Sequence, residues 1–163
     1  MAANTELELL ELDDDHLSLQ LHSGSVSARL RTREAAQEFD LVTSEGRFRA
    51  ERSGHYRFDR IDDTSSVTVW SGQAQYEGAG AALAVQAGQR VEFWRERGRP
   101  QYSITDPRRD GFSDWVASDE RREQRSVSSR YVSPEMTGAE DLDHHGRCKP
   151  QGRSNLSFTP FGM

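Results

Sequence analysis

The segments Gly46-Arg-Phe-Arg-Ala50, Gly54-His-Tyr-Arg-Phe58 and Gly72-Gln-Ala-Gln-Tyr76 decide the fold of this chain. In each of them an apolar residue stands two and four positions after the glycine, and Gly24-Ser-Val-Ser-Ala28 repeats the pattern. A two-residue period of this kind is typical of a half-buried strand that leaves a turn. We therefore interpret five glycines as turn residues that open strands: Gly24, Gly46, Gly54, Gly72 and Gly88.

The same alternation runs through residues 5–94 and predicts one β-domain of about ten short strands at roughly eight-residue spacing. We expect a mainly β fold, either a roll, a sandwich or a short solenoid. Within it, residues 17–21 and 26–30 are predicted to form a hairpin that turns at residues 22–25. The polar run of residues 61–66 is predicted to be a loop between two further strands.

The composition and the periodicity of the sequence change after residue 94. Residues 95–110 are charged, contain prolines and show no periodicity, so we predict a linker. Residues 111–125 carry Phe112, Trp115 and Val116 at helical spacing and are predicted to form one amphipathic helix. Residues 126–145 are predicted to be extended and irregular, and the tail of residues 146–163 to be poorly ordered.

Composition excludes several classes of protein. The chain of 163 residues carries 27 acidic and 21 basic side chains, so it lacks the basic surface that nucleic-acid binding requires. No apolar run approaches the roughly 20 residues of a membrane-spanning helix. Cys148 is the single cysteine, so no disulfide can form within the chain. The first residues show no signal peptide, and the sequence taken as complete would be cytoplasmic.

The sequence shows no convergent catalytic or metal site, so we expect a protein that is not an enzyme and holds no cofactor. Asp13-Asp14-Asp15 lacks the spacing of a calcium loop and is predicted to be a turn. Gly78-Ala-Gly80 is not followed by the third glycine and the helix of a nucleotide-binding loop. His144-His145, near Asp141 and Asp143, is the one metal-like cluster, and its spacing is poor.

Aromatic side chains are the candidates for contact with a ligand or a partner. Trp70 and Tyr76 lie within predicted strands, at positions counted as alternating, and are expected in the core. Trp94 directly precedes the predicted linker and Tyr102 lies within it, where a ring can stay exposed and stack on a sugar or a partner. The full set of contact candidates, with one residue from the predicted helix and one beyond it, is Trp94, Tyr102, Trp115 and Tyr131.

Four motifs between residues 17 and 93 resemble the FecR-like domain of bacterial envelope proteins. In chain order they are Leu21-His-Ser-Gly24-Ser-Val26, Val42-Thr-Ser-Glu-Gly46-Arg-Phe48-Arg49, Val69-Trp-Ser-Gly72-Gln-Ala74 and Leu83-Ala-Val85-Gln-Ala87-Gly88-Gln89. Each motif is short and built around a turn, so their common order carries the resemblance. The resemblance implies a β-rich domain located in the periplasm or associated with the cell envelope.

A second resemblance lies in residues 112–143. Phe112-Ser-Asp-Trp115, Tyr131-Val-Ser-Pro-Glu-Met-Thr-Gly138 and Glu140-Asp-Leu-Asp143 are similar to proteobacterial proteins in which such a segment follows a FecR-like domain and precedes a Trp/Tyr/Pro-rich region. Two positions depart from that pattern, Ala139 in place of a tyrosine and Cys148 in place of a tryptophan. We therefore expect a chain truncated at both ends, with its last residues read in a shifted frame.

Three functions remain open for such a domain. The first is a non-catalytic interaction module that binds a protein or cell-wall partner in the envelope. The second is a domain that binds peptidoglycan or another carbohydrate. The third is a sensory domain of the anti-sigma type, as the resemblance implies for FecR-like proteins. The sequence predicts no nucleic-acid partner and no membrane span in this chain, and it leaves the ligand and the oligomeric state open.

Overall fold

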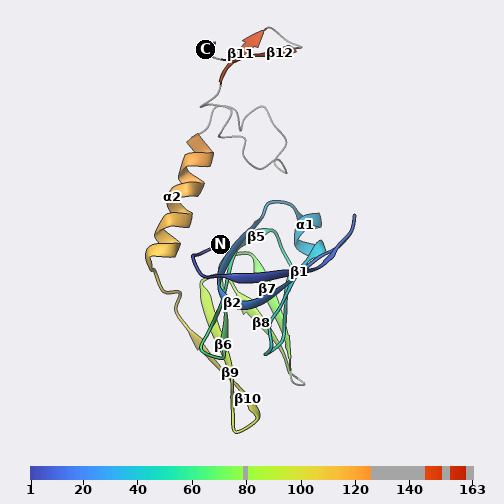
Figure 1. Ribbon diagram of the computed structural model, residues 1–163, viewed down its shortest axis with the longest axis vertical. Coiled ribbons are helices and arrows are strands. Elements are labelled where there is room, and N and C mark those ends of the chain that lie inside the picture. Colours follow the sequence, from blue (N-terminus) through green and yellow to red (C-terminus); the bar gives the residue numbers. More distant parts are fainter. Residues whose placement is uncertain (79–80, 126–145, 152–154, 161–163) are drawn as a thin grey trace. The chain divides into compact units, whose positions relative to one another are not determined.

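The computed structural model describes residues 1–78, 81–125, 146–151 and 155–160 (Figure 1). They belong to two units, Met1–Arg108 and Arg109–Met163, which are described separately. The first unit is mainly β, as the sequence predicts. Its elements are β1 (Glu6–Leu12), β2 (Leu17–Leu30), α1 (Arg33–Glu38), β3 (Phe39–Val42), β4 (Arg47–Ala50), β5 (Gly54–Ile61), β6 (Thr64–Ser71), β7 (Gln73–Gly78), β8 (Ala81–Gln86), β9 (Gln89–Glu96) and β10 (Arg99–Thr105).

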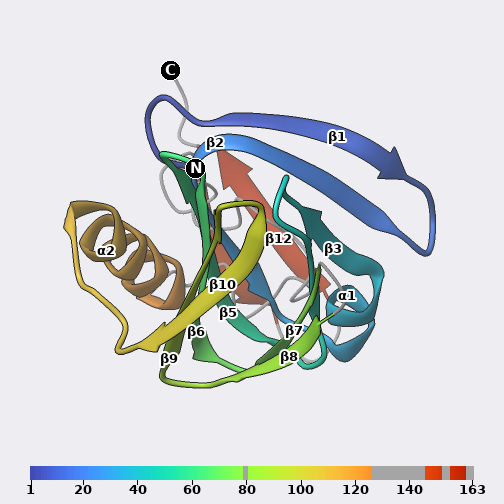
Figure 2. The same cartoon turned by 90° about the horizontal axis from the view of Figure 1, so that it is seen from below.

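One sheet of ten strands, which curls on itself, makes up most of the first unit (Figure 2). β2 is shared by both halves of this sheet. Residues 24–30 of β2 pair with β5, which continues through β6 and β9 to β10. Residues 17–20 of β2 pair in parallel with β3, which continues through β4 and β7 to β8. β1 pairs with the other edge of this part of β2, and α1 forms the crossover between β2 and β3.

The predicted turn at residues 22–25 is wrong, because β2 runs without a break from Leu17 to Leu30. Gly24 has a φ of +93° and bends the strand where its partner changes from β1 to β5. A Cβ atom at this position would lie 2.6 Å from the Cα atom of Thr5. Both features require glycine, yet neither reverses the chain, because each half of β2 pairs with a different strand.

The predicted loop at residues 61–66 is a two-residue turn. Ile61 pairs with Thr64, and between them Asp62 and Asp63 have φ values of +49° and +60°. Two successive left-handed residues are the geometry of a type I′ turn, whose twist matches that of a hairpin. Strands β5 and β6 therefore extend through residues that were predicted to form a loop because most of them are polar.

The predicted linker at residues 95–110 is mostly a hairpin. β9 extends to Glu96, Arg97 and Gly98 form a second two-residue turn with φ values of +50° and +76°, and β10 returns to Thr105. The physical reason is that β10 is an edge strand. Edge strands tolerate charged residues and proline, which are the features that made this run resemble a linker. Residues 106–110 lie after the hairpin and belong to no helix or strand.

The core lies on the inward face of the curled sheet and contains a cluster of aromatic rings. Phe48 of β4 is 1% exposed, and its ring centroid lies 5.7 Å from Phe58, 5.2 Å from Tyr76 and 5.6 Å from Phe93. The rings of Tyr76 and Phe93 are stacked, with their centroids 3.7 Å apart. Because these residues come from β4, β5, β7 and β9, the cluster joins both halves of the sheet.

The two aromatic residues predicted to be buried differ in their positions. Tyr76 lies in the core, with 5% of its surface exposed. Trp70 is partly exposed instead, which corrects the prediction. Val67 and Val69 occupy the inward positions of β6, so the alternation of the strand turns Trp70 to the outer face.

The remaining predicted turn glycines lie at or next to strand ends. Gly46 precedes β4 and Gly54 is the first residue of β5. Gly72 lies between β6 and β7, and Gly88 lies between β8 and β9, where its N–H donates to the carbonyl of Val69 at 2.7 Å. Gly24 is the member of the set that bends a strand rather than separating two.

Replacing Gly72 by alanine is expected to destabilise the fold more than replacing Gly88. Both glycines have positive φ values, +93° and +81°, so alanine at either position costs about 1–2 kcal/mol of backbone strain. A Cβ atom at Gly72 would also collide with the Tyr56 hydroxyl, whereas nothing lies within 4 Å of one at Gly88. Chemical denaturation of the two variants measures the difference, and equal losses would show that the collision is relieved.

Stability is expected to fall at alkaline pH, because burial raises the pKa of Tyr76 above its ordinary value of 10.0 and the nearby Glu45 raises it further. Burial likewise raises the pKa of Tyr56. Between pH 10.0 and the folded-state pKa, the unfolded chain loses protons that the folded chain keeps. The stability contributed by these hydroxyls is therefore complete below the unfolded pKa and is lost as the pH rises toward the folded pKa.

Unfolding titrations at several pH values around 10 measure this loss as a slope of the free energy of unfolding against pH. The slope should be shallower in the Tyr76→Phe variant, which keeps the ring and removes the titrating hydroxyl. That variant also loses the hydrogen bond from the hydroxyl to the carbonyl of Glu45 at 2.8 Å, so the slope rather than the absolute stability is compared. An unchanged slope would contradict the prediction.

The second unit contains α2 (Gly111–Arg125), β11 (Gly146–Gln151) and β12 (Asn155–Pro160). α2 spans the residues that the sequence predicts to be helical, and Asp110 accepts a hydrogen bond from the N–H of Ser113 at 2.9 Å at its start. Within residues 146–163, the structure describes β11 and β12, which pair antiparallel, with Gly146 opposite Pro160. The segment of residues 126–145, predicted to be extended, lies outside the described residues.

Candidate interaction surface

The β9–β10 hairpin presents apolar side chains at one edge of the sheet, and it extends beyond the rest of the first unit (Figure 1). Among the described strands, β10 pairs with β9 alone. Tyr102 is 56% exposed and Ile104 is 52% exposed. Their cross-strand partners, Phe93 and Val91, both belong to the core. The apolar inward face of the sheet therefore continues onto β10, where it is open to solvent.

Trp94, another predicted contact residue, lies on the opposite face of this hairpin from Tyr102. Trp94 pairs with Gln101, whereas Tyr102 pairs with Phe93. Because successive residues of a strand point to opposite faces, the partly exposed indole of Trp94 and the ring of Tyr102 cannot stack on the same ligand. The structure brings these two candidates into one hairpin without bringing them into one site.

The other two predicted contact residues lie in the second part of the chain. Trp115 of α2 is 54% exposed, and its ring is stacked with that of Phe112 at a centroid distance of 6.1 Å. Tyr131 lies outside the described residues. Of the four candidates, Tyr102 is exposed on the inward face of the sheet, Trp94 is partly exposed on its outer face, and Trp115 is exposed on α2.

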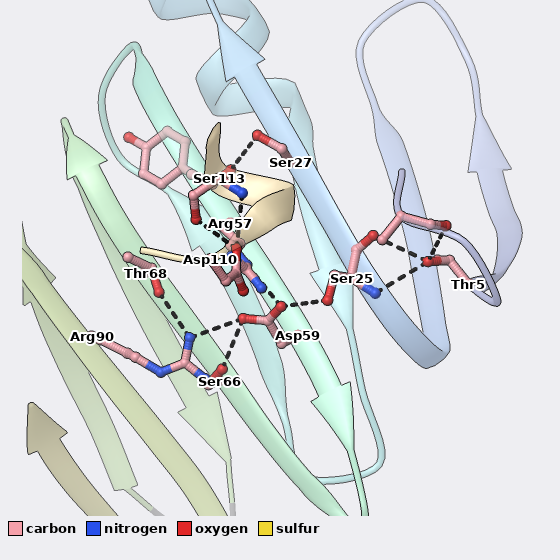
Figure 3. A network of polar contacts seen from close by, with 12 residues as sticks. Thr5, Ser25, Ser27, Arg57, Asp59, Ser66, Thr68, Arg90, Asp110 and Ser113 are labelled. Carbon is pink, nitrogen blue, oxygen red and sulfur yellow. Dashed lines mark hydrogen bonds and ion pairs between the residues drawn. The ribbon is translucent and has the colours of Figure 1, made fainter. Parts of the chain in front are cut away.

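A buried polar network centred on Asp59 connects β9 to its half of the sheet (Figure 3). Asp59 of β5 is 2% exposed, and its Oδ1 atom accepts hydrogen bonds from Arg57 Nε at 2.8 Å and Ser25 Oγ at 2.5 Å. Its Oδ2 atom accepts from Arg90 Nη1 at 3.0 Å and from Ser66 Oγ at 3.3 Å. These donors come from β2, β5, β6 and β9, so one carboxylate links four strands.

The register of the strands explains why these polar groups meet. Phe58 points into the core, so its neighbours Arg57 and Asp59 point to the outer face, where Ser25 and Ser66 lie directly opposite Asp59. Arg90 lies one row away, and it also donates to Thr68 Oγ1 at 3.3 Å and to Glu92 Oε1 at 3.1 Å.

The arrangement of this network suits a structural role rather than a reactive one. Both oxygens of Asp59 are engaged by two donors each, which leaves no lone pair directed at a substrate. Among its ion pairs, Arg57 contacts Asp59, and Arg90 contacts both Asp59 and Glu92. The network therefore holds β9 in place, and β9 in turn carries β10 and its exposed apolar side chains.

A second buried carboxylate, Asp40 of β3, belongs to a separate cluster. It is 1% exposed, its Oδ1 atom lies 2.7 Å from His16 Nε2, and its Oδ2 atom lies 3.1 Å from Arg47 Nε. No group of three His, Cys, Asp or Glu side chains suited to a metal ion occurs in the described part of the chain. The predicted metal-like pair His144-His145 lies outside that part.

Sequence reasoning missed Ile104 of this surface and two residues of the buried network that supports it, Asp59 and Arg90. Ile104 alternates with Tyr102, which is a strand signal within the run interpreted as a linker. Asp59 and Arg90 occupy alternate positions with core residues of β5 and β9, which places them on the outer face but does not show that they are buried together.

Comparisons with known proteins concern the fold. The chain resembles a crystal structure at 1.65 Å resolution of a candidate anti-sigma factor from Parabacteroides distasonis, with a TM-score of 0.51 and 11% identity over 96% of this chain and 86% of that one. A 2.50 Å structure of a candidate anti-sigma factor from the same organism gives a TM-score of 0.49 and 12% identity over 93% and 84% of the two chains.

At these identities the likeness defines a class of fold, a curled and mainly antiparallel β-domain. No protein-family model matches the chain, and no curated protein matches it significantly. Among the described residues, no helix has both the length and the apolar character needed to cross a membrane.

Proposed function

We propose that this chain is a non-catalytic, FecR-like interaction module of the bacterial envelope, which binds a protein partner through the edge of its sheet at β10. One observation carries the proposal. Tyr102 and Ile104 are more than half exposed although they continue the face that forms the core. An edge strand with an open apolar face is the arrangement to which a partner chain adds in β-strand recognition.

The character of the hairpin favours a protein over a sugar as the ligand. Carbohydrate binding by stacking requires exposed rings that face the same side, and Trp94 and Tyr102 face opposite sides. Arg95, Arg97 and Arg99 surround the tip of the hairpin and are all exposed, so they suit a partner with an acidic rim. Pro100 has no N–H group, so it cannot donate a hydrogen bond to an added strand.

Different observations support the envelope location and the signalling role. The order of the four motifs between residues 17 and 93 supports a FecR-like domain and hence an envelope location. The fold of the candidate anti-sigma factor from Parabacteroides distasonis favours a signalling role, with a protein as the partner, over binding to the cell wall. Peptidoglycan binding remains the second candidate and is an outcome of the experiment below.

Removal of the apolar side chains of β10 should abolish partner binding. The immobilised chain is incubated with envelope proteins of the bacterium that makes it and, separately, with purified peptidoglycan. Wild type should retain a protein that the Tyr102→Ser/Ile104→Ser variant retains about tenfold less, because exposed apolar contacts of this size contribute about 1 kcal/mol or more each. Ile61→Ser is the matched control, since Ile61 is 55% exposed on a different strand.

Retention of peptidoglycan by wild type and by both variants would favour the wall-binding alternative. Equal retention of every protein by wild type and by the β10 variant would contradict the proposed surface. Circular dichroism of each variant shows that the loss of binding is not a loss of folding.

A further inference from the structure

The sheet of the first unit has a second open edge with an apolar face, at β1. β1 pairs with β2 alone among the described strands. Leu9 is 53% exposed and Leu12 is 67% exposed, although their cross-strand partners Leu19 and Leu17 pack against the core. The apolar inward face therefore continues onto β1, as it does onto β10. The two edges lie apart in the unit, so neither edge covers the exposed apolar side chains of the other (Figure 1).

The third open edge differs from these two. Among the strands that the structure describes, β8 pairs with β7 alone, but Val85 of β8 is fully buried and Leu83 packs against the core. No large apolar side chain described on β8 is exposed. The edges that lack a cover for their apolar faces are therefore β1 and β10, and each is a strand of seven residues.

The charges of the two edges have opposite signs. The first 28 residues contain six carboxylates, on Glu6, Glu8, Glu11 and Asp13-Asp14-Asp15, and no lysine or arginine. Six carboxylates equal the whole formal net charge of −6, so the rest of the chain is neutral. By contrast, the turn of the β9–β10 hairpin carries Arg95, Arg97 and Arg99 against the single acid Glu96.

These charges select among the ways in which two copies can meet. Pairing of β1 with β1 would bring two acidic edges together, and parallel pairing of β10 with β10 would bring two arginine-rich turns together, so both are disfavoured. In antiparallel pairing of β10 with β10 the two turns lie at opposite ends, where their arginines meet none of the carboxylates of β1. Pairing of β1 with β10 brings acids to arginines and aligns two apolar faces on the same side of a continuous sheet. The partner surface that complements β10 is therefore present on the chain itself.

We propose that the β10 edge of one copy binds the β1 edge of a second copy, with the arginines at the turn end of β10 facing carboxylates at one end of β1. This inference rests on the proposed function in that it takes β10 as the binding edge, and it names a second copy as the occupant. A head-to-tail contact of this kind uses two different surfaces, so it does not close at a dimer and extends to short open chains.

Analytical ultracentrifugation of the full chain tests the proposal. The weight-average mass of wild type should rise above 18.5 kDa with concentration, without a plateau at the dimer, and should fall toward 18.5 kDa as salt screens the charges. We expect a Kd tighter than about 1 mM. A wild-type chain that stays at 18.5 kDa up to that concentration overturns the proposal.

A charge exchange identifies the two surfaces. The Glu6→Arg/Glu11→Arg variant and the Arg97→Glu/Arg99→Glu variant should each associate much more weakly than wild type. In the first, strand β1 carries two arginines against Glu8, and in the second, the turn carries three acids against Arg95, so within each variant β1 and the turn carry charges of the same sign. An equimolar mixture of the two variants should associate again, since each acidic edge now meets a basic one. Leu12→Ser, which changes no charge, should also weaken association of the wild-type chain. Variants that associate alone as strongly as wild type would place the contact on another surface.

The outcomes separate this inference from the proposed function. Suppose that wild type is monomeric, but the Tyr102→Ser/Ile104→Ser variant fails to retain an envelope protein that wild type retains. This result would overturn self-association and leave the proposed function standing. A monomeric wild type with no such loss would overturn both. Self-association that is lost in the Tyr102→Ser/Ile104→Ser variant supports both.

Discussion

Replacing Asp59 by asparagine is expected to lower the free energy of unfolding by about 3–5 kcal/mol, the usual cost of breaking a buried ion pair by removing one partner. The carboxylate is 2% exposed and accepts hydrogen bonds from two arginines, Arg57 and Arg90. Asparagine keeps the shape of the side chain but loses the charge, and one oxygen becomes an NH₂ group that faces a donor. Two guanidinium groups would then lie near the outer face of the sheet without this counter-charge.

Urea denaturation followed by circular dichroism measures this loss. Asp62→Asn is the matched control, because Asp62 is an exposed aspartate in the turn that follows the same strand. Asparagine tolerates a positive φ, so the control should stay within about 0.5 kcal/mol of wild type. If Asp59→Asn also stayed in that range, Asp59 would not hold the strands together. Loss of the network should also loosen β9, so hydrogen exchange of the β9–β10 hairpin should rise in Asp59→Asn.

Replacing Phe48 by alanine is expected to cost about 3–5 kcal/mol, the range for truncation of a buried phenylalanine. Phe48 is 1% exposed and contacts Phe58, Tyr76 and Phe93 with its ring. The contacts come from both halves of the curled sheet, so neither half can close the cavity without moving away from the other. The cost should therefore lie toward the upper end of the range.

Phe48→Leu separates the loss of volume from the loss of the ring. Leucine refills most of the cavity, so this variant should lose about half as much stability as Phe48→Ala or less. Tyr102→Ala is the control for an aromatic residue outside the core, because Tyr102 is 56% exposed, and its cost should be well under that of Phe48→Ala. Equal losses for Phe48→Ala and Tyr102→Ala in urea denaturation would contradict the central place of Phe48 in the core.

Alternation along single strands was predictable, because it depends only on the geometry of an extended chain. Tyr56 and Phe58 of β5 and Phe48 of β4 all occupy the inward positions that the spacing after glycine predicts. Trp70, which is not one of the positions spaced from a glycine, was placed incorrectly. It was counted as an alternating apolar position, whereas Val67 and Val69 define the inward face of β6.

Turns and linkers were less predictable, because the same residues serve different geometries. Glycine at position 24 permits a turn and equally a bend with a φ of +93°. The difference lies in the partner strands, β1 and β5, which come from elsewhere in the chain. Likewise the arginines and the proline of residues 95–105 suit a linker and equally an edge strand, and pairing with β9 decides between them.

The candidate surface was predictable in part. Tyr102 was selected from the sequence as a contact residue, and it lies exposed on β10. Trp94 was selected with it, but the register of β9 against β10 places it on the other face. No local pattern shows that Ser25, Asp59, Ser66 and Arg90 meet, because they belong to four strands that are brought together only by the long-range pairing of the sheet.

By itself the sequence determined that this protein is a β-domain of short strands with a helix after it, because strand period, turn residues and helical spacing are local properties of the chain. The tertiary structure alone decided which strands lie at the edges, which of their apolar side chains stay exposed and which polar groups are buried together. Those features depend on strand order and register, and the pairing of residues far apart in the sequence sets both.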